Sequence, residues 1–569
     1  MRAGHLLLVV LVLVSSCGTT TERQQDVEGT RYGGVFNLNE TEALRSIFPP
    51  TLTQASAFRI MSQVYQGLVT FDPQDLTIKP CLAERWEVDE QATTFDFHLR
   101  AGVFFHDDPA FRDGQGRELT AEDVVRCFTL ICTKGPGDGT FWLFQDRVLG
   151  ANEHYRSGAG PEVPVEGIKL VDERTVRITL AQASPGFLQI VAHQGCWIWP
   201  EELTKEYGAV PQVNAIGTGP FRLKAFSPAQ AMVLERNPDY WGRGASEEAL
   251  PYLDAVRVTF DTDKDSEFQG LLAGRITALL ELPVDRIRDL SDSMDAATGQ
   301  QRFTVRSRPA LASQFYGFNA RKGPFADVRV RRAFALAIDR TFLVDSVLGG
   351  LAEPARHGLV PPGLAEYPYG LVPGIPFAPD SARVLLAEAG YPGGEGFPSL
   401  QLQTNADGFG YVRVAEAVQM MLERELHIPI SVTVMPADRH YDRVDGGSVL
   451  FWREGWTADH PDPENFLSLL YGKNAVLDST LPATINKTRF NDKTFNDLFA
   501  RATVTAERSE RMRLLAEAEK AALQEMPIIP LYHEEATYVV QPWVRGLRLN
   551  AIEYLDLSEV WYERPTPAP

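Results

Sequence analysis

The sequence predicts an α/β protein, with α+β as the related alternative. Short strand-like runs alternate with amphipathic helical segments along the whole chain, and no internal repeat is visible. Turn signals rich in Gly and Pro are frequent, as at 33–34, 135–139, 361–363 and 393–394. These turns indicate many surface loops, but none is a low-complexity linker that would divide the chain into domains.

The first residues follow the pattern of an export signal. Arg2 gives a basic start, residues 6–14 form an apolar run, and two serines precede Cys17. Nine apolar residues are about half of the ~20 that a membrane-spanning helix needs, so we expect a cleaved signal peptide over residues 1–16. Val-Ser-Ser-Cys at 14–17 resembles the bacterial lipobox, whose Cys becomes the acylated amino terminus. An ordinary signal peptide with an incidental Cys is the alternative.

The residues that follow predict a flexible tether. Residues 17–30 are polar and nearly free of apolar side chains, so they cannot bury enough surface to fold. A flexible chain of that length spans roughly 20 Å as a root-mean-square average. With Cys17 lipidated, the body would stay near the membrane yet remain free to turn.

The composition excludes some classes of partner. The chain has 55 Lys and Arg against 75 Asp and Glu, a formal charge of −20 at pH 7. This negative charge disfavours binding to nucleic acid and broad electrostatic attraction to anionic lipid. No second long apolar segment follows the signal, so we expect the body of the protein to be soluble.

The remaining cysteines do not form a dense framework. They are Cys81, Cys127, Cys132 and Cys196, and their spacing matches neither a disulfide scaffold nor a paired Cys-x-x-Cys metal pattern. Cys127 and Cys132 lie in an apolar stretch, so we expect them to be buried as small hydrophobic residues. Whether any of the four form disulfides is left open.

Three helices are predicted with defined ends. Thr120 is typical of an N-cap, followed by acidic residues in the first turn and an apolar face. Asp327 is a second cap, before a helix with apolar residues at helical spacing. Residues 507–525 form a long helix rich in Ala, Leu, Glu and Arg, which Pro527 ends.

An ordered set of short segments resembles a known family. The segments are Gly-Gly-Val-Phe at 33–36, Val-Tyr-Gln-Gly-Leu-Val at 64–69, 95–106 with the helix start at 120–124, Gly-Thr-Gly-Pro-Phe at 217–221, Asn-Pro-Asp-Tyr-Trp-Gly at 237–242, 318–319, 324–331, Ala-Ile-Asp-Arg at 337–340, Pro-Ile-Ile-Pro-Leu at 527–531 and Val-Arg-Gly at 544–546. Each is modest alone, but in this order they resemble the large solute-binding proteins of family 5, the peptide and nickel binders of ATP-driven importers. The resemblance covers nearly the whole mature chain.

The resemblance implies an architecture and a function. The architecture is the two-lobed periplasmic-binding-protein type II (Venus-flytrap) fold with an additional inserted domain. Carried onto this chain, the first lobe holds 31–55, 195–305 and 533–569, the insertion holds 56–194 and the second lobe holds 306–532. The implied function is that of a lipid-anchored, monomeric substrate-binding protein in the periplasm or at the cell surface. It would deliver a peptide to ABC transporter permease subunits.

The loop at 455–463 is the strongest candidate for the ligand site. It joins aromatic and carboxylate side chains, and its prolines exclude an ordinary helix or central strand. In peptide-binding members of the family, the Asp that matches Asp459 accepts the α-ammonium group of the ligand. The alternative is that Asp459 caps a solvated turn, and we assign that role to Asp462. Trp456 is either a ligand-stacking wall or part of the core.

The stretch Phe315-Tyr316-Gly317-Phe318-Asn319 resembles the cleft strand of the family. There the backbone can pair with an extended peptide while side chains occupy pockets. Alternate strand residues face opposite ways, so Phe315 and Asn319 lie opposite Tyr316 and Phe318. Which of the two sets contacts the ligand is left open, and core packing is expected for the other.

The segment 403–411 departs from the dipeptide binders of the family. These place an Arg there for the carboxylate of the ligand, whereas this segment contains no Arg or Lys. An oligopeptide is therefore favoured over a dipeptide, or a solute with a cation but no carboxylate held at this position. Asn405 and Phe409 are candidate contacts, and Phe409 with Tyr411 suits a loose aromatic pocket or equally a surface loop.

The sequence contains no common enzyme or metal motif. It has no Gly-x-Ser-x-Gly elbow, no His-Glu-x-x-His pair and no phosphate-binding Gly-rich loop before Lys. No cofactor is expected, and the acidic turn at 261–265 lacks the Gly and Glu of a calcium loop. Two alternatives stay open: a metal-chelate, haem or oligosaccharide binder on the same fold, in which His460 assists, and an exported hydrolase using Asp459 and Glu454.

Overall fold

The computed structural model describes residues 32–563, apart from residues 42, 53, 136–138, 212, 229, 281–289, 291–301, 365, 407–409, 479–480 and 553. The predicted signal peptide, Cys17 and all of the tether therefore lie outside the described residues, as does Phe409. Strands and helices alternate along the described chain, as predicted. Within it, no helix is long and apolar enough to cross a membrane.

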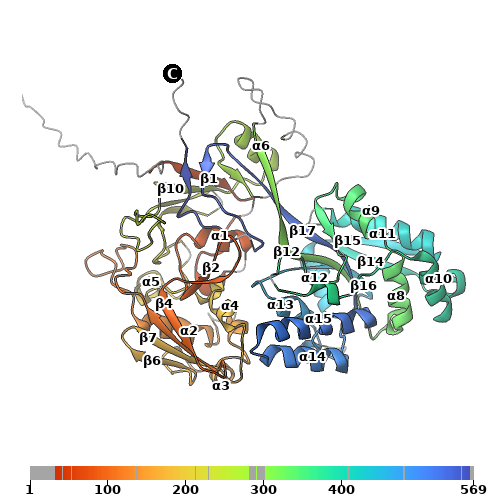
Figure 1. The fold of residues 1–569 in the computed structure, drawn as a ribbon. Helices are drawn as coiled ribbons and strands as arrows, with labels where there is room; N and C mark the ends of the chain where they lie inside the picture. The colour runs from red at the N-terminus through yellow and green to blue at the C-terminus, as the bar shows by residue number, and fades with distance from the viewer. Residues whose placement is uncertain are drawn as a thin grey trace, which may run out of the picture.

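One part of the molecule is built on a four-stranded sheet in the order β1-β10-β9-β8. Its strands are β1 (Val35–Asn39), β8 (Phe221–Ser227), β9 (Ala231–Arg236) and β10 (Ala255–Thr259). β1 and β10 pair in parallel although they are far apart in the chain, and the other pairs are antiparallel. The helices α1 (Ala55–Met61) and α6 (Lys264–Leu272) and the short strands β18 (Val544–Arg545) and β19 (Trp561–Tyr562) belong to the same half of the molecule (Figure 1).

A second four-stranded sheet, antiparallel and in the order β4-β5-β7-β6, lies below the first in Figure 1. Its strands are β4 (Ala83–Val88), β5 (Thr94–Leu99), β6 (Ile168–Asp172) and β7 (Thr175–Thr179), with a small pair of β2 (Val69–Phe71) and β3 (Ile78–Pro80) nearby. The helices are α2 (Ala121–Ile131), α3 (Ala151–Ser157), α4 (Phe187–Val191) and α5 (Glu201–Tyr207). The predicted start of α2 is confirmed, because Asp123 Oδ2 accepts a hydrogen bond from the backbone N–H of Thr120 at 3.1 Å.

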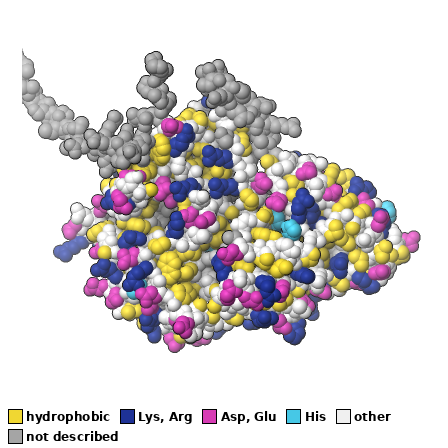
Figure 2. Space-filling model, viewed as in Figure 1, with side chains coloured by type: hydrophobic (Ala, Val, Ile, Leu, Met, Phe, Trp, Pro, Cys, Tyr) yellow, Lys and Arg dark blue, Asp and Glu magenta, His cyan; other side chains and the backbone are white. Residues whose placement is uncertain are grey.

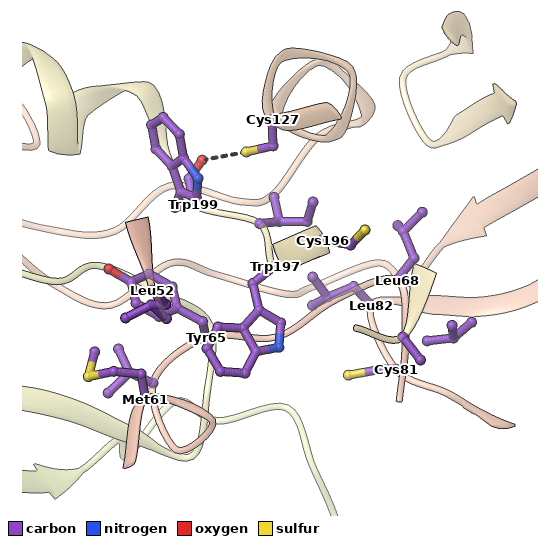
Figure 3. Close-up of a cluster of buried hydrophobic side chains, with 14 of the residues drawn as sticks. Leu52, Met61, Tyr65, Leu68, Cys81, Leu82, Cys127, Cys196, Trp197 and Trp199 are labelled. Atoms are coloured by element: carbon purple, nitrogen blue, oxygen red, sulfur yellow. Dashed lines mark hydrogen bonds between the residues drawn. The ribbon is translucent and has the colours of Figure 1, made fainter. Parts of the chain in front are cut away.

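These two sheets share one continuous hydrophobic core. Figure 3 shows part of it, where the rings of Tyr65 and Trp197 stack with centroids 5.9 Å apart. All four described cysteines are free and buried, as predicted for Cys127 and Cys132. Cys127 Sγ lies 3.4 Å from the carbonyl oxygen of Trp199, to which it donates. The described cysteines therefore serve as packing residues.

The other half of the molecule is built on a seven-stranded sheet in the order β11-β17-β12-β16-β14-β15, with β13 beside β17. The strands are β11 (Ala278–Leu279), β12 (Thr304–Phe318), β13 (Ala352–Pro354), β14 (Leu400–Asn405), β15 (Ile430–Met435), β16 (Phe451–Thr457) and β17 (Ile528–Val540). The helices are α8 (Val328–Leu336), α9 (Arg340–Phe342), α10 (Pro379–Glu388), α11 (Tyr411–Leu426), α12 (Ala437–Asp445), α13 (Pro463–Leu467), α14 (Lys493–Val504) and α15 (Arg508–Glu525).

Helices cover both faces of this sheet, and each face has its own core. On one face α8, α10 and α11 enclose one cluster, and on the other α13, α14 and α15 enclose a second (Figure 1). The predicted cap at Asp327 is confirmed, because its side chain accepts from the N–H of Arg329 at the start of α8. The long helix predicted over residues 507–525 is α15, and Glu507 caps it by accepting from the N–H of Ser509. The centre of the sheet is therefore buried on both sides.

Two long strands link the halves. β12 and β17 pair along most of their length, with register breaks between Pro309 and Ser313 and between Gln314 and Phe315. At its far end β17 pairs with β11, beside the first four-stranded sheet (Figure 1). On the face of the molecule drawn in Figure 2, acidic and basic side chains are interspersed.

Candidate functional site

The predicted cleft strand lies in the middle of the seven-stranded sheet. Phe315 is 4% exposed and packs in the core under α14 and α15, whereas Tyr316 and Phe318 are 1% and 0% exposed and pack in the core under α8 and α11. The predicted alternation of these side chains is confirmed. Tyr316 and Phe318 contact the ring of Phe451, so both serve the core in this conformation.

Asn319 is also buried and forms the turn after β12. Its side-chain oxygen accepts from the N–H of Arg321 at 3.3 Å, and its own N–H donates to the carbonyl of Leu450 at 3.0 Å. Its Nδ2 has no partner among the described residues. The local contacts account for the turn, and a ligand contact of Asn319 stays a prediction.

The prediction of a loop over all of 455–463 is wrong at both ends, because residues 455–457 belong to β16 and Pro463 begins α13. Asn465 holds the remaining loop against the end of β16. Its Oδ1 accepts from the indole Nε1 of Trp456 at 2.7 Å and from the backbone N–H of Asp459 at 3.3 Å, and its Nδ2 donates to Asp459 Oδ2 at 3.1 Å. Sequence reasoning missed Asn465, which lies outside the predicted loop on α13. One amide thus fixes both predicted residues, and their side chains stay half-buried.

The carboxylate of Asp459 has no ionic partner in the part of the chain that the structure describes. No Lys, Arg or His there forms an ion pair with it, and its hydrogen bond from Asn465 comes from a neutral amide. Among the described residues, no ion pair therefore compensates the charge of this half-buried group. A half-enclosed carboxylate of this kind is suited to a cationic donor from outside.

Asp459 faces the other half of the molecule. Its negative charge acts on His193, a buried residue beside α4 whose pKa is lowered to about 4 by burial. Near it, Gln189 Nε2 on α4 donates to the carbonyl of Pro461 at 3.4 Å. Arg147 Nη2 lies 3.7 Å from Glu464 Oε1. The candidate site is thus built at the contact between α4 and the start of α13 (Figure 1).

Asp462 has a different environment, although it is only three residues from Asp459. It caps α13 by accepting from the N–H of Glu464, and it is 1% exposed. Arg511 on α15 binds it through two nitrogens, at 2.6 and 2.9 Å. Burial opposes its ionisation, but the Arg511 guanidinium outweighs burial and holds the pKa of Asp462 below its usual range. The capping role predicted for Asp462 is confirmed, but the expectation of a solvated turn is wrong, because Asp462 is buried and paired with Arg511.

A buried cation lies beside the segment that contains no Arg or Lys. Arg453, on β16, is 5% exposed and donates to Asn405 Oδ1 at 3.2 Å, to the hydroxyl of Tyr441 at 3.3 Å and to Gln314 Oε1. Its guanidinium carbon lies 3.4 Å from the ring centre of Tyr411. No carboxylate in the described chain forms an ion pair with it.

Sequence reasoning missed Arg453. The absence of a cation from 403–411 suggested that nothing there holds a carboxylate, but a neighbouring strand supplies the guanidinium. The available signal was an Arg between Trp452 and Glu454 at a central strand position. Arginine is seldom fully buried unless it has a partner, so its presence there indicates a structural or functional role. Asn405, a predicted contact, serves as one of the neutral partners of Arg453.

The edge of β16 between these charges has no strand beside it among the described residues. β14 pairs with β16 only at Phe451 and Trp452, while β12 pairs with it through Thr457. The carbonyl oxygen of Arg453 already lies 3.0 Å from His440 Nε2, so it is the backbone from Glu454 to Thr457 that is paired with a strand on one side alone. An extended chain could add to the other side, with Arg453 near one end and Asp459 near the other.

The described residues contain no group of three or more His, Cys, Asp or Glu that could hold a metal ion. His460 is buried, its pKa is lowered by burial, and its Nδ1 lies 3.2 Å from Asn465 Nδ2. Its contacts assist the fold of the loop.

A family profile decides the classification. Residues 77–478 match the family of bacterial extracellular solute-binding proteins, family 5 Middle. The chain belongs to this family. The resemblance noted in the sequence is thereby confirmed, and membership places the chain in an extracytoplasmic, solute-binding class.

Curated relatives of this solute-binding protein cover nearly the whole chain. Heme-binding protein A of Haemophilus influenzae is 27% identical over 559 residues, which are 96% of this chain and 96% of that protein. Probable di/tripeptide-binding protein 5 of Pseudomonas aeruginosa is 27% identical over 90% of this chain and 92% of its own length.

Solved structures confirm the two-lobed type II fold. The periplasmic binding protein DppA from Helicobacter pylori, in complex with the peptide STSA, has a TM-score of 0.75 at 22% identity and covers 94% of this chain and 99% of that chain. HbpA2 from Haemophilus parasuis has a TM-score of 0.75 at 25% identity, over 93% of this chain and 100% of that chain.

Proposed function

We propose that this solute-binding protein captures peptides with a free amino terminus between its lobes and delivers them to the permease of an ABC importer. It acts as a binding protein rather than an enzyme. The observation that carries the proposal is the carboxylate of Asp459, which is half-buried at the contact between the lobes and whose one hydrogen-bond partner among the described residues is a neutral amide. A ligand ammonium group supplies both the missing positive charge and three donors.

Arg453 complements Asp459. It is a buried cation whose hydrogen-bond partners are all neutral, which is costly unless an anion compensates it. A peptide carries an ammonium group at one end and a carboxylate at the other, so one ligand satisfies both residues. The unpaired edge of β16 supplies backbone donors and acceptors that do not depend on the side chains of the peptide.

The spacing of the two charges favours oligopeptides over dipeptides. Asp459 follows Arg453 by six residues, and six residues of extended chain span at most about 20 Å at ~3.3 Å each. A dipeptide reaches about a third of that distance. With the reach of the Arg side chain taken into account, peptides of about four to six residues fit the span.

The division into lobes is part of the proposal. All strands of the sheet β4-β5-β7-β6 fall within the proposed insertion at 56–194, and those of β1-β10-β9-β8 fall within the proposed first lobe. β12 and β17 are the links at which the lobes would rotate. Closure is then driven by contacts that form only when a ligand joins the lobes.

Export and anchoring rest on the sequence alone. Residues 1–16 act as the signal peptide, and lipid on Cys17 holds the monomeric protein at the outer side of a membrane. Cys17→Ser should move the protein from the membrane fraction to the soluble fraction. Retention of Cys17→Ser in washed membranes would contradict the lipid anchor.

The direct test of the function is native mass spectrometry of the full chain with matched peptide pools. One pool holds tri- to hexapeptides with free amino termini, and the other holds the same peptides acetylated at the amino terminus. We expect peptides to be retained from the first pool and not from the second, because acetylation removes the ammonium group. Equal retention from both pools would contradict the role of Asp459, and no retention from either would contradict peptide binding.

A further inference from the structure

A small cavity lies against the face of β16 that carries Trp456. It is lined by residues that include Phe315, Leu359, Trp452, Glu454, Trp456 and Lys487. It offers about 30 Å³ to the centres of water-sized groups, and a single water needs roughly 10–15 Å³ by the same measure. The cavity therefore has room for about two or three such groups, which is the size of a short side chain.

The strand geometry explains how the cavity is formed. Trp452, Glu454 and Trp456 alternate along β16, so they share one face, and Phe315 on β12 pairs directly with Glu454. The indole of Trp452 lies over Gly317, where a Cβ would come within 2.7 Å of Trp452 Cε2. Only glycine at this position of the strand leaves space for the ring.

Two polar groups of the cavity lack hydrogen-bond partners. Trp452 is 1% exposed and its Nε1 has no acceptor among the described residues. Glu454 is 7% exposed, and its Oε2 receives no aligned hydrogen bond although it lies 3.1 Å from Lys487 Nζ. The cavity thus contains a donor without an acceptor, which is costly when buried, and an ion-paired carboxylate that can accept a further hydrogen bond.

The charges in the cavity decide which group fits. An anionic group would face the carboxylate of Glu454, and a cationic group would face the ammonium of Lys487, which also lies 3.4 Å from Asp445 Oδ1. A neutral group that both accepts and donates, such as a hydroxyl or a carboxamide, satisfies Trp452 and Glu454 together. The size of the cavity excludes a large aromatic side chain.

The cavity is connected to the proposed ligand site through Trp456. Its ring lines the cavity, while its N–H donates to Asn465, which also holds Asp459. A peptide lying along the edge of β16 directs alternate side chains to opposite faces of the sheet. One of them therefore points to the face on which the cavity lies.

From these contacts we propose that the cavity is a specificity subsite for one short, neutral, hydrogen-bonding side chain of the peptide, of the Ser, Thr or Asn type. The inference rests on the proposed function and extends it to the class of ligand.

The test uses tetra-alanine and its variants with Thr, Val, Asn, Asp or Lys at each position in turn, bound to the full chain and measured by calorimetry. Thr and Val have nearly the same shape, as do Asn and Asp, so each pair isolates hydrogen bonding or charge. At one position we expect Thr to bind at least about tenfold more tightly than Val, and Asn at least about tenfold more tightly than Asp or Lys.

The variant Trp452→Phe removes the donor and keeps an aromatic ring. It should reduce the preference for Thr over Val to less than about threefold, with the affinity for tetra-alanine changed by less than about threefold. Trp241→Phe is the matched control, because it removes an indole N–H that donates to Gln66 in the other half of the molecule. The control should keep the preference.

If Trp452→Phe does not fold, Glu454→Gln provides the second variant. It removes the charge that repels Asp, so the preference for Asn over Asp at that position should fall below about threefold. Tetra-alanine binding with no preference at any position, or a preference that survives both variants, overturns the subsite and leaves peptide capture intact. Failure of every peptide to bind overturns peptide capture and the subsite with it.

Discussion

The strand Phe315–Asn319 and the loop 455–463 have similar aromatic and polar residues but different surroundings. The side chains of the strand lie in a sheet covered by helices on both faces, and none of its aromatic rings is more than 4% exposed. In the segment 455–463, Trp456 at the end of β16 and Asp459 in the loop after it stay half-buried at the contact between the halves of the molecule. Aromatic content alone therefore does not identify a ligand surface. The decisive difference is whether the polar and charged groups of each segment already have hydrogen-bond and ionic partners within the protein.

The same contrast separates two aspartates of one loop. Asp462 is buried, caps α13 and is paired with Arg511, so the fold satisfies it completely. The carboxylate of Asp459 receives one hydrogen bond, from a neutral amide, and no counter-charge among the described residues. A carboxylate without a counter-charge at an interface is a better sign of a ligand site than a carboxylate in a motif.

Phe318→Ala tests the structural side of the comparison and has the largest expected effect. Its ring is fully buried and stacks on Phe451 with centroids 5.1 Å apart. Truncation should lower the free energy of unfolding by about 3–5 kcal/mol. Urea unfolding followed by circular dichroism measures this loss, and peptide affinity of the folded protein should be unchanged. A large loss of affinity without a loss of stability would move Phe318 into the ligand site.

Asp459→Asn tests the functional side. The variant keeps the hydrogen bond from Asn465 but removes the charge that would pair with the ligand ammonium. We expect binding to weaken by about 2–5 kcal/mol, or roughly 30- to 5,000-fold, with stability changed by less than about 0.5 kcal/mol. Calorimetric titration with a binding peptide, together with thermal unfolding, measures both. Unchanged affinity would show that Asp459 caps a turn and does not bind the ligand.

Glu519 gives a prediction of pH dependence on the buried side of the sheet. It accepts from the N–H groups of Leu359 and Val360 at 2.6 and 3.0 Å and from the hydroxyl of Tyr367 at 2.5 Å. Burial outweighs these donors and raises the pKa of Glu519 from 4.5 to about 7. The folded state therefore holds the proton more tightly than the unfolded state.

The resulting stabilisation is complete below about pH 4.5 and is lost as the pH rises through about 7, by roughly 3 kcal/mol in total. Glu519→Gln should remove this part of the pH dependence. Unfolding of both proteins in urea between pH 4.5 and pH 8 measures the difference. Parallel curves for the two proteins would show that Glu519 is already ionised at low pH.

Asp462→Asn is the matched partner of Asp459→Asn. Asn keeps the cap of α13, and Arg511 keeps Glu464 at 2.8 Å, so the cost is smaller than for an isolated buried charge. We expect stability to fall by about 1–3 kcal/mol and peptide affinity to stay within about threefold. The reverse pattern, with affinity lost and stability kept, would exchange the roles of the two aspartates.

Arg147→Gln has the smallest expected effect and probes the contact between the halves. The pair with Glu464 is 3.7 Å long, so it contributes less than about 1 kcal/mol. Its loss should open the ligand-free protein slightly and change peptide affinity by less than about fivefold. Small-angle X-ray scattering with and without peptide follows the opening. A large change in the opening or in the peptide affinity would show that this ion pair holds the two halves of the molecule together.

The fold family and much of the local structure could be predicted from the order of residues. The helix that starts at Thr120, the cap at Asp327, the long helix from residue 507 and the alternation of Phe315 with Tyr316 each depend on neighbouring residues, so they can be predicted from the local sequence. The ordered motifs were specific enough to identify the family from the order of residues alone. The turn role of Asp462 was also predictable, because a cap depends only on the residues that follow it.

Which charges are left for a ligand became visible in the three-dimensional arrangement of the elements. Arg511 is far from Asp462 in the chain and still neutralises it, whereas Asp459 receives only the amide of Asn465 from α13. Arg453 came to lie against Asn405 and Tyr411 because β16 and β14 are neighbours in the sheet. Electrostatic compensation acts through space between elements that are distant in sequence, so it cannot be read from the order of residues.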